Sequence, residues 1–515
     1  MADVLVRGGW VVDGTGAPAY RADVAISGDR ITEVGPLPGA RGATEIDATG
    51  RYVMPGFIDT HVHGDAAVFA PEVQLAALRQ GVTTFVLGQD GVSFAPASAA
   101  TLAYVSRYFA PVNGRHPGLD GGPVTVAALL AGYDRRLPLH TVYLLPHGTI
   151  RRNALGAARR APDAGELAAM LRDVERGLEE GAAGLSTGLE YFPGAYAEAG
   201  ELAALCRPVA AAGLPYVTHM RGYEAKAGDG MAEVLRIAAS SGVAPHVSHY
   251  HGPREHLIAL VDDARAEGVD LTFDNYPYLR GSSTLTLVTL PGWLPVADLD
   301  ATLEALADPA VRRRLEGEWT ADLWPRITLS HVPADDLRWT EGLTLLEAAE
   351  RAGRSPGEFC CDLLVATRLE AGCVFGQPPT NTEESVRALL RHSAQTTGSD
   401  AIYQGGHPHP RGWGAFARLL ARHVRELGDW TWEQAAVHMS AHAARRFRLL
   451  DRGLVRRGFA ADLVVLNPRT VTDRSTYESP RTPADGVDHV LVAGVPVLAG
   501  GALTGALPGR ALTPG

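Results

Sequence analysis

The middle of the chain repeats one pattern, in which a short apolar run ends in polar or charged residues. The runs are GFIDTHVH (56–63), VTTFVLGQD (82–90), TVYLLPHGT (141–149), AAGLSTGLEY (182–191), LPYVTHMR (214–221), APHVSHYH (244–251), VDLTFDNYPY (269–278) and QTTGSDA (395–401). Segments with helical character, such as 161–181, lie between several of them. The spacing is about 30 residues through much of this region, the length of a β-loop-α-loop unit. Eight such runs predict an α/β fold, a (β/α)₈ TIM barrel, with the polar residues at the carboxyl ends of its strands.

Both ends of the chain have a different pattern: apolar and polar residues alternate in short predicted strands that are separated by Gly and Asp turns. Neither end is long enough to make a stable sheet easily by itself. We therefore expect one small β domain built from residues 1–54 and 453–515, with the barrel at 55–452 between them. A stretch too long for a single crossover predicts an inserted lobe or lid at about 283–395.

Composition argues against a nucleic-acid-binding protein and a membrane-spanning protein. The chain has 515 residues and a formal net charge of −11, which argues against a nucleic-acid partner. Its four cysteines form no CxxC pair, and the start of the sequence does not resemble a signal peptide. No apolar run is long enough for a membrane span, so we expect a cytoplasmic protein with a small-molecule substrate and no membrane partner. The oligomeric state, monomer or small homo-oligomer, stays open.

Histidines gather at the predicted carboxyl ends of three strands. His61 and His63 are two apart on one strand and so project from the same face. His219 and His249 end two later strands, and Asp400 ends the last. A lone histidine is usually a hydrogen-bonded core residue, but this combination favours a site for a cation such as Zn²⁺.

These motifs resemble those of the amidohydrolase superfamily. PGFIDTHVH after a β meander, THMR, SHYH and a late GSD are shared by the superfamily, and STGLEY with DNYPYLRGSSTL is similar to its N-acyl-D-amino-acid deacylase (D-aminoacylase) branch. The resemblance covers nearly the whole chain. It implies a distorted barrel, a small β-sandwich formed by both termini, and one or two zinc ions.

The resemblance also implies roles for individual residues. Asp400 would be the general acid/base, although GSD also suits a turn or helix cap. Tyr191 would donate a hydrogen bond to the reacting oxygen, or be a core tyrosine. Tyr276 and Ser282 would lie near the substrate carboxylate, or serve the strand end and turn.

The third strand end supplies two further candidates. His147 and Arg151 could face the acyl group or the carboxylate, or lie on a surface loop.

Two positions depart from the family pattern. Asp90 stands where the branch typically has a metal-binding cysteine. A carboxylate is a harder ligand than a thiolate, so metal preference could shift from zinc towards Mn²⁺ or Co²⁺; Asp90 could also lie behind the ligands and orient a histidine. His251 stands where the branch commonly has a lysine, and a histidine is fully charged only below its pKa.

The sequence thus predicts a metal-dependent hydrolase of N-acyl-D-amino acids or related N-acylated compounds. A cyclic-amide hydrolase like the dihydropyrimidinases is a second reading, although the fourth strand end lacks the lysine that those enzymes usually carboxylate. A non-catalytic scaffold of the same fold is a third, but such relatives usually lose ligands that this chain keeps.

Overall fold

The computed structural model describes residues 2–515 and contains a closed ring of parallel strands. In order these are β6 (Phe57–Asp59), β8 (Val82–Leu87), β9 (His140–Tyr143) continuing as β10 (Leu145–Pro146), β11 (Leu185–Gly188), β12 (Pro215–His219), β13 (Ala244–Val247), β14 (Thr272–Asn275) and β18 (Gln395–Thr397). The ring closes where the Thr60 amide donates to the Thr397 carbonyl at 3.0 Å and β19 (Ala401–Ile402) pairs with β7 (Val62–His63). The predicted barrel is confirmed, and each of the eight apolar runs supplies one of its strands.

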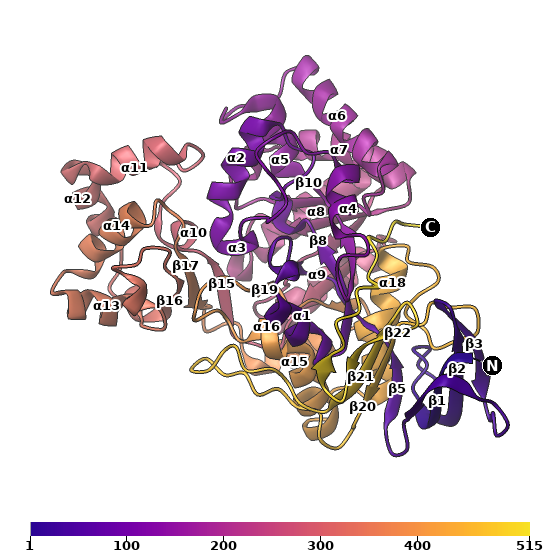
Figure 1. Cartoon of the computed structure of the whole chain (residues 1–515). Coiled ribbons are helices and arrows are strands. Elements are labelled where there is room, and N and C mark those ends of the chain that lie inside the picture. The colour runs from indigo at the N-terminus through magenta and orange to yellow at the C-terminus, as the bar shows by residue number, and fades with distance from the viewer. Residues whose placement is uncertain (1) are drawn as a thin grey trace.

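Helices follow the barrel strands and enclose the ring (Figure 1). They are α1 (Pro71–Leu78), α2 (Ala99–Tyr108), α3 (Ala110–Asn113), α4 (Val126–Tyr133), α5 (His147–Leu155), α6 (Ala164–Glu179), α7 (Ala199–Ala211), α8 (Ala227–Ser241), α9 (Arg254–Ala266), α15 (Glu383–Leu390), α16 (Arg411–Arg418), α17 (Trp432–Ala436) and α18 (His442–Arg446). Helix α6 begins where Asp163 and Glu166 form a reciprocal capping box, which satisfies amides that the first turn leaves unpaired. Within residues 2–515, no helix has both the length and the apolar character needed to cross a membrane.

The two ends of the chain meet in one nine-stranded sheet beside the barrel (Figure 1). It contains β1 (Ala2–Val11), β2 (Tyr20–Ser27), β3 (Arg30–Gly35), β4 (Gly42–Asp47), β5 (Tyr52–Pro55), β20 (Leu463–Leu466), β21 (Val487–Val492), β22 (Val495–Ala499) and β23 (Ala502–Leu503). The pairing of β5 with β20 joins the N-terminal half to the C-terminal half. Val6, Val24 and Leu463 are among the residues of a separate small apolar core within this sheet.

The last residues of the chain do not stay with the terminal sheet. The Leu512 amide donates to the Thr141 carbonyl of β9 at 2.7 Å, and the Arg135 amide donates to the Gly509 carbonyl at 2.7 Å. The expectation that 453–515 belongs wholly to the small β domain is therefore corrected, because the end of the chain lies against the barrel.

A lobe inserted after β14 stands away from the barrel (Figure 1). It consists of β15 (Arg280–Thr284), α10 (Leu285–Thr289), α11 (Leu299–Ala307), α12 (Pro309–Glu318), β16 (Ile327–His331), α13 (Leu345–Ala352), α14 (Pro356–Ala366) and β17 (Gly372–Gly376). The next helix, α15, packs against α9 and leads into β18, so it is a barrel helix. The lobe therefore ends near residue 376, earlier than the predicted 395.

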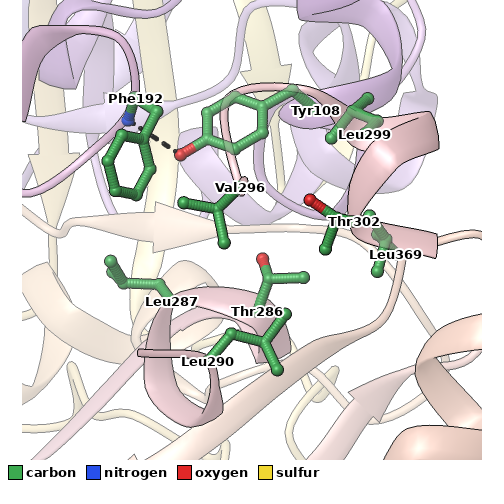
Figure 2. Close-up of a pocket in the computed structure, with 9 residues that line it drawn as sticks. All are labelled: Tyr108, Phe192, Thr286, Leu287, Leu290, Val296, Leu299, Thr302 and Leu369. Carbon is green, nitrogen blue, oxygen red and sulfur yellow. Dashed lines mark hydrogen bonds between the residues drawn. The ribbon is translucent and has the colours of Figure 1, made fainter. Parts of the chain in front are cut away.

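The lobe meets the barrel through an apolar contact (Figure 2). Leu287, Val296 and Leu299 of the lobe face Tyr108 and Phe192 of the barrel around a cavity of about 30 Å³. The Phe192 amide donates to the Tyr108 hydroxyl at 3.0 Å. A space of that size admits little more than a water molecule, so this contact serves to fix the lobe beside the Tyr191 segment.

Candidate metal centre and active site

Asp90 lies at the centre of the carboxyl end of the barrel. After β8 the chain turns through Gly88 (φ 77°), where a Cβ would approach the Leu144 carbonyl oxygen to 2.3 Å. Only glycine fits this turn. Asp90 itself has a left-handed backbone (φ 54°) and is 3% exposed. The turn thus directs a carboxylate into the barrel mouth.

The first strand brings two imidazoles to this carboxylate. The Nε2 atom of His61 lies 3.6 Å from Asp90 Oδ1, and Nε2 of His63 lies 3.5 Å from Asp90 Oδ2. Together the three side chains have the spacing of a metal-binding group.

Two later strands complete a second group on the same carboxylate. His219 ends β12 and places Nδ1 3.8 Å from Asp90 Oδ2. His249 follows β13 and places Nε2 3.8 Å from Asp90 Oδ1. Asp90, His219 and His249 also have metal-binding spacing, so the two triads share Asp90.

Asp400 faces the first triad from the end of the last strand. Its Oδ1 lies 3.6 Å from His61 Nε2 and 3.5 Å from His63 Nε2. The other oxygen is 2.9 Å from Nη1 of Arg411, a fully buried residue at the start of α16. Burial would raise the pKa of Asp400, but Arg411 and the histidines lower it below its usual value, so the group is ionised at neutral pH.

The electrostatics of the cluster favour a cation. Burial would raise the pKa of Asp90, yet His61 and the other histidines lower it well below its usual value. Burial alone would lower the pKa of His63, but Asp400 and Asp90 raise it to about 10. For His219, burial is likewise outweighed by Asp90 and Glu190, which raise its pKa to about 10.

Several buried ligand atoms have no hydrogen-bond partner among the described residues. They are both ring nitrogens of His61, Nδ1 of His219 and Oδ1 of Asp90. Unpaired buried polar atoms are costly, and imidazole nitrogen with carboxylate oxygen is a donor set that Zn²⁺ accepts. The residues therefore fit a divalent metal.

Aromatic and hydroxyl side chains form one wall next to the cluster. The Tyr191 ring packs 5.1 Å from the His219 ring, and its hydroxyl hydrogen-bonds with the Ser283 hydroxyl at 2.9 Å. Burial raises the pKa of Tyr191 well above its usual value, so it keeps its proton. Ser282, one residue earlier, donates to the Cys373 carbonyl within the lobe sheet, so its hydrogen is already used there.

Tyr276 lies against Arg411, the arginine that pairs with Asp400. The guanidinium carbon of Arg411 lies 4.7 Å from the centre of the Tyr276 ring. None of the guanidinium N–H groups of Arg411 makes a well-aligned hydrogen bond among the described residues, although its charge pairs with Asp400. A buried guanidinium with free donors is suited to a carboxylate.

The two candidates from the third strand point elsewhere. His147 Nε2 donates to Glu201 of α7 at 2.8 Å, and Arg151 pairs with the same carboxylate. Arg151 also donates to the Arg160 carbonyl at 2.6 Å. Both side chains are fully buried, so neither lies on a surface loop, and they hold α5 to α7 rather than offering charge to a substrate.

His251 lies at the mouth but brings no positive charge. Burial lowers its pKa to about 4, so the ring is neutral at pH 7. Its Nδ1 donates to the His249 carbonyl at 2.7 Å, and the ring stacks 4.9 Å from Tyr223. A substrate-binding role for His251 would therefore be limited to its free Nε2, which can then only accept a hydrogen bond.

A family model described as the amidohydrolase family matches residues 44–498. The chain belongs to the amidohydrolase family. The superfamily predicted from the metal motifs is therefore confirmed.

Full-length relatives place this amidohydrolase in the predicted branch. It is 36% identical to N-acyl-D-glutamate deacylase of Alcaligenes xylosoxydans xylosoxydans over 509 residues, which cover 96% of this chain and 93% of the relative. It is 32% identical to D-aminoacylase of the same organism, over 99% of this chain and 97% of the relative. The N-acyl-D-amino-acid deacylase branch is thus confirmed.

Comparison with solved structures supports the same branch. N-acyl-D-glutamate deacylase from Bordetella bronchiseptica, solved with zinc and a phosphonate inhibitor that mimics the tetrahedral intermediate, matches with a TM-score of 0.83 and 31% identity over 99% of both chains. Dihydropyrimidinase from Brevibacillus agri matches with a TM-score of 0.60 at 16% identity over 99% of this chain and 98% of the other, which shows a shared fold alone.

The structure gives the histidines of this amidohydrolase site hydrogen-bond partners that the sequence patterns did not predict. Asn113 accepts from His63 Nδ1 at 3.2 Å, and Asp274 accepts from the His249 amide at 2.8 Å. Glu190 accepts from His219 Nε2 at 3.1 Å. Arg411 is the last residue of the sequence HPR (409–411) and begins α16.

Proposed function

We propose that this amidohydrolase uses a divalent metal to hydrolyse the amide bond of N-acyl-D-amino acids. The observation that carries the proposal is the sharing of Asp90 by two histidine pairs, with the Asp400 carboxylate 3.5 Å from His63. The names of the full-length relatives support the substrate class.

Five side chains would hold the metal: His61, His63, Asp90, His219 and His249. Because the Asp90 carboxylate lies within 3.8 Å of all four histidines, the site is suited to one ion or two. Zinc is the first candidate, and the harder carboxylate ligand makes Mn²⁺ or Co²⁺ alternatives. When bound, such a metal supplies a polarised carbonyl and a more acidic water.

Asp400 would move the proton. As an ionised carboxylate it can take a proton from the attacking water and later give it to the departing amine. Arg411 holds its second oxygen and so fixes the direction of the first. The protonated Tyr191 hydroxyl can donate to the oxygen that gains charge as the tetrahedral carbon forms.

Arg411 and Tyr276 would hold the free carboxylate of the substrate. The guanidinium is buried and keeps N–H groups without aligned partners. The Tyr276 ring lies against it, and the Tyr276 hydroxyl accepts from Gln377 at 3.2 Å, which leaves its own hydrogen free to donate. A carboxylate between them would compensate a charge that is otherwise only partly paired.

The test is a panel of N-acetyl-D-amino acids against their L enantiomers, with release of the free amino acid as the readout. We expect hydrolysis of D substrates and little of L substrates. Hydantoin or dihydrouracil in the same panel tests the cyclic-amide alternative. Turnover of the cyclic amides without turnover of any N-acyl-D-amino acid would overturn the proposal.

A further inference from the structure

Glu190 carries a carboxylate at the barrel mouth that the proposed chemistry does not use. It follows β11 directly before Tyr191, and its side chain is 41% exposed. Among the described residues, no lysine or arginine lies within ion-pair distance of it, and its one charged partner is His219. Arg221 is the nearest cation in sequence to that histidine, but its guanidinium donates to Glu233 and to the Ala195 carbonyl.

The contact involves the side of the His219 ring that faces away from the metal centre. Glu190 Oε2 lies 3.1 Å from Nε2, and Asp90 Oδ2 lies 3.8 Å from Nδ1. A carboxylate can only accept, so Nε2 carries the hydrogen in this pair. In the neutral form that a metal ion requires, the ring then has its lone pair on Nδ1, the atom directed at Asp90.

We propose that Glu190 is a positioning residue for the metal: it fixes the tautomer and rotation of His219 so that Nδ1 binds the ion shared with Asp90 and His249. The inference rests on the metal site of the proposed function. An outer carboxylate also makes its imidazole a better electron donor.

The other triad offers a comparison within the same site. His63 donates from Nδ1 to the side-chain oxygen of Asn113 at 3.2 Å, and Asn113 is itself fixed by donating to the Val92 carbonyl at 2.9 Å. That outer partner is a neutral amide. In the same triad the Asp274 carboxylate lies 3.7 Å from His61 Nδ1, beyond hydrogen-bond distance, so Glu190 differs from it in being hydrogen-bonded to its histidine.

A purely structural role for Glu190 is the competing explanation. Its second oxygen, Oε1, accepts from the Gly222 amide at 3.2 Å and so ties the β11 and β12 loops together. That role predicts a change in folding stability without a specific change in metal affinity.

The experiment measures the dissociation constant for Zn²⁺ by competition with a chromophoric chelator, with the melting temperature of the metal-free protein alongside. Glu190→Ala should weaken Zn²⁺ binding by about 10- to 100-fold. Glu190→Gln should lose less, because its amide oxygen can still accept from Nε2. Asp262→Ala is the matched control, since it removes a carboxylate from His392 Nε2 at 3.0 Å far along the chain, and it should bind Zn²⁺ like the unchanged protein.

Each result decides the matter. Unchanged Zn²⁺ affinity in Glu190→Ala overturns the inference, as does an equal loss in both Glu190 variants together with a lowered melting temperature of the metal-free protein. If Glu190→Ala does not fold, Glu190→Gln decides by the same measurement: weakened Zn²⁺ binding with an unchanged melting temperature supports the inference. Absence of Zn²⁺ binding by the unchanged protein would instead remove the proposed function.

Discussion

Replacing Asp400 with asparagine should abolish most of the turnover while leaving the metal in place. Asparagine keeps the shape of the side chain but cannot accept a proton from water. General acid–base catalysis contributes about 10²- to 10⁴-fold to rate, which corresponds to about 3 to 5 kcal/mol in the activation free energy. Both triads stay complete, because Asp400 belongs to neither.

The structure places the expected loss towards the upper end of that range. The nearest alternative carboxylate at the first triad is Asp90, whose oxygens face four histidines at 3.5 to 3.8 Å and would bind the metal rather than take the proton. Asp400 is 7% exposed and fixed by Arg411, so bulk water and buffer are poor substitutes for it.

The assay compares kcat for an N-acetyl-D-amino acid with the metal content of the same preparation. Asp485→Asn is the control, because that carboxylate also pairs with an arginine, Arg79 at 2.8 Å, in the terminal part of the chain. It should turn over normally. Near-normal kcat in Asp400→Asn at full metal content would refute the role of Asp400 as the base, and a parallel loss of metal would make it a ligand instead.

Substitutions at three further positions have expected outcomes. Asp90→Ala should lower the metal content measured by elemental analysis, whereas Asp90→Cys should retain Zn²⁺ and bind Mn²⁺ less well; unchanged metal content in Asp90→Ala would remove Asp90 from the ligands. Arg411→Met should raise KM by about 10- to 100-fold, from the 1.5 to 3 kcal/mol typical of a hydrogen bond to a charged group, and an unchanged KM would place the substrate carboxylate elsewhere. Burial lowers the pKa of His438 to about 4, below the value near 6.5 of an unfolded chain, so its contribution to stability is complete above pH 6.5 and is lost as the pH falls towards 4. Asparagine in His438→Asn can still donate to the Gln395 carbonyl but does not titrate. Between pH 7 and pH 5, the free energy of unfolding from urea titrations should therefore fall by about 2 kcal/mol less in this variant than in the unchanged protein. An equal fall in both proteins would show that His438 does not titrate as its burial requires.

The barrel could be predicted from the sequence because each strand is a local apolar run that ends in polar residues. Val82 to Leu87 is a buried apolar run, and a turn glycine ends it before Asp90. The carboxyl ends of parallel strands meet at one edge, so the histidines and Asp400 could be grouped without knowing any distance.

The partners of those residues could not be predicted in the same way. Arg151 looks available in the sequence, but Glu201, which neutralises it, comes from a helix some 50 residues later. Asn113 and Glu190 reach their histidines from loops and short helices whose positions depend on the assembled barrel. The path of the last residues along β9 likewise follows from tertiary packing, since no local pattern marks it.

The most direct test of the account is metal titration of stripped protein with hydrolysis of an N-acetyl-D-amino acid as the readout. Chelator-treated protein should be inactive, and added Zn²⁺, Co²⁺ or Mn²⁺ should restore hydrolysis as the Asp90-centred site fills, in step with the metal bound per chain. Full hydrolysis by protein shown to contain no metal would contradict the account.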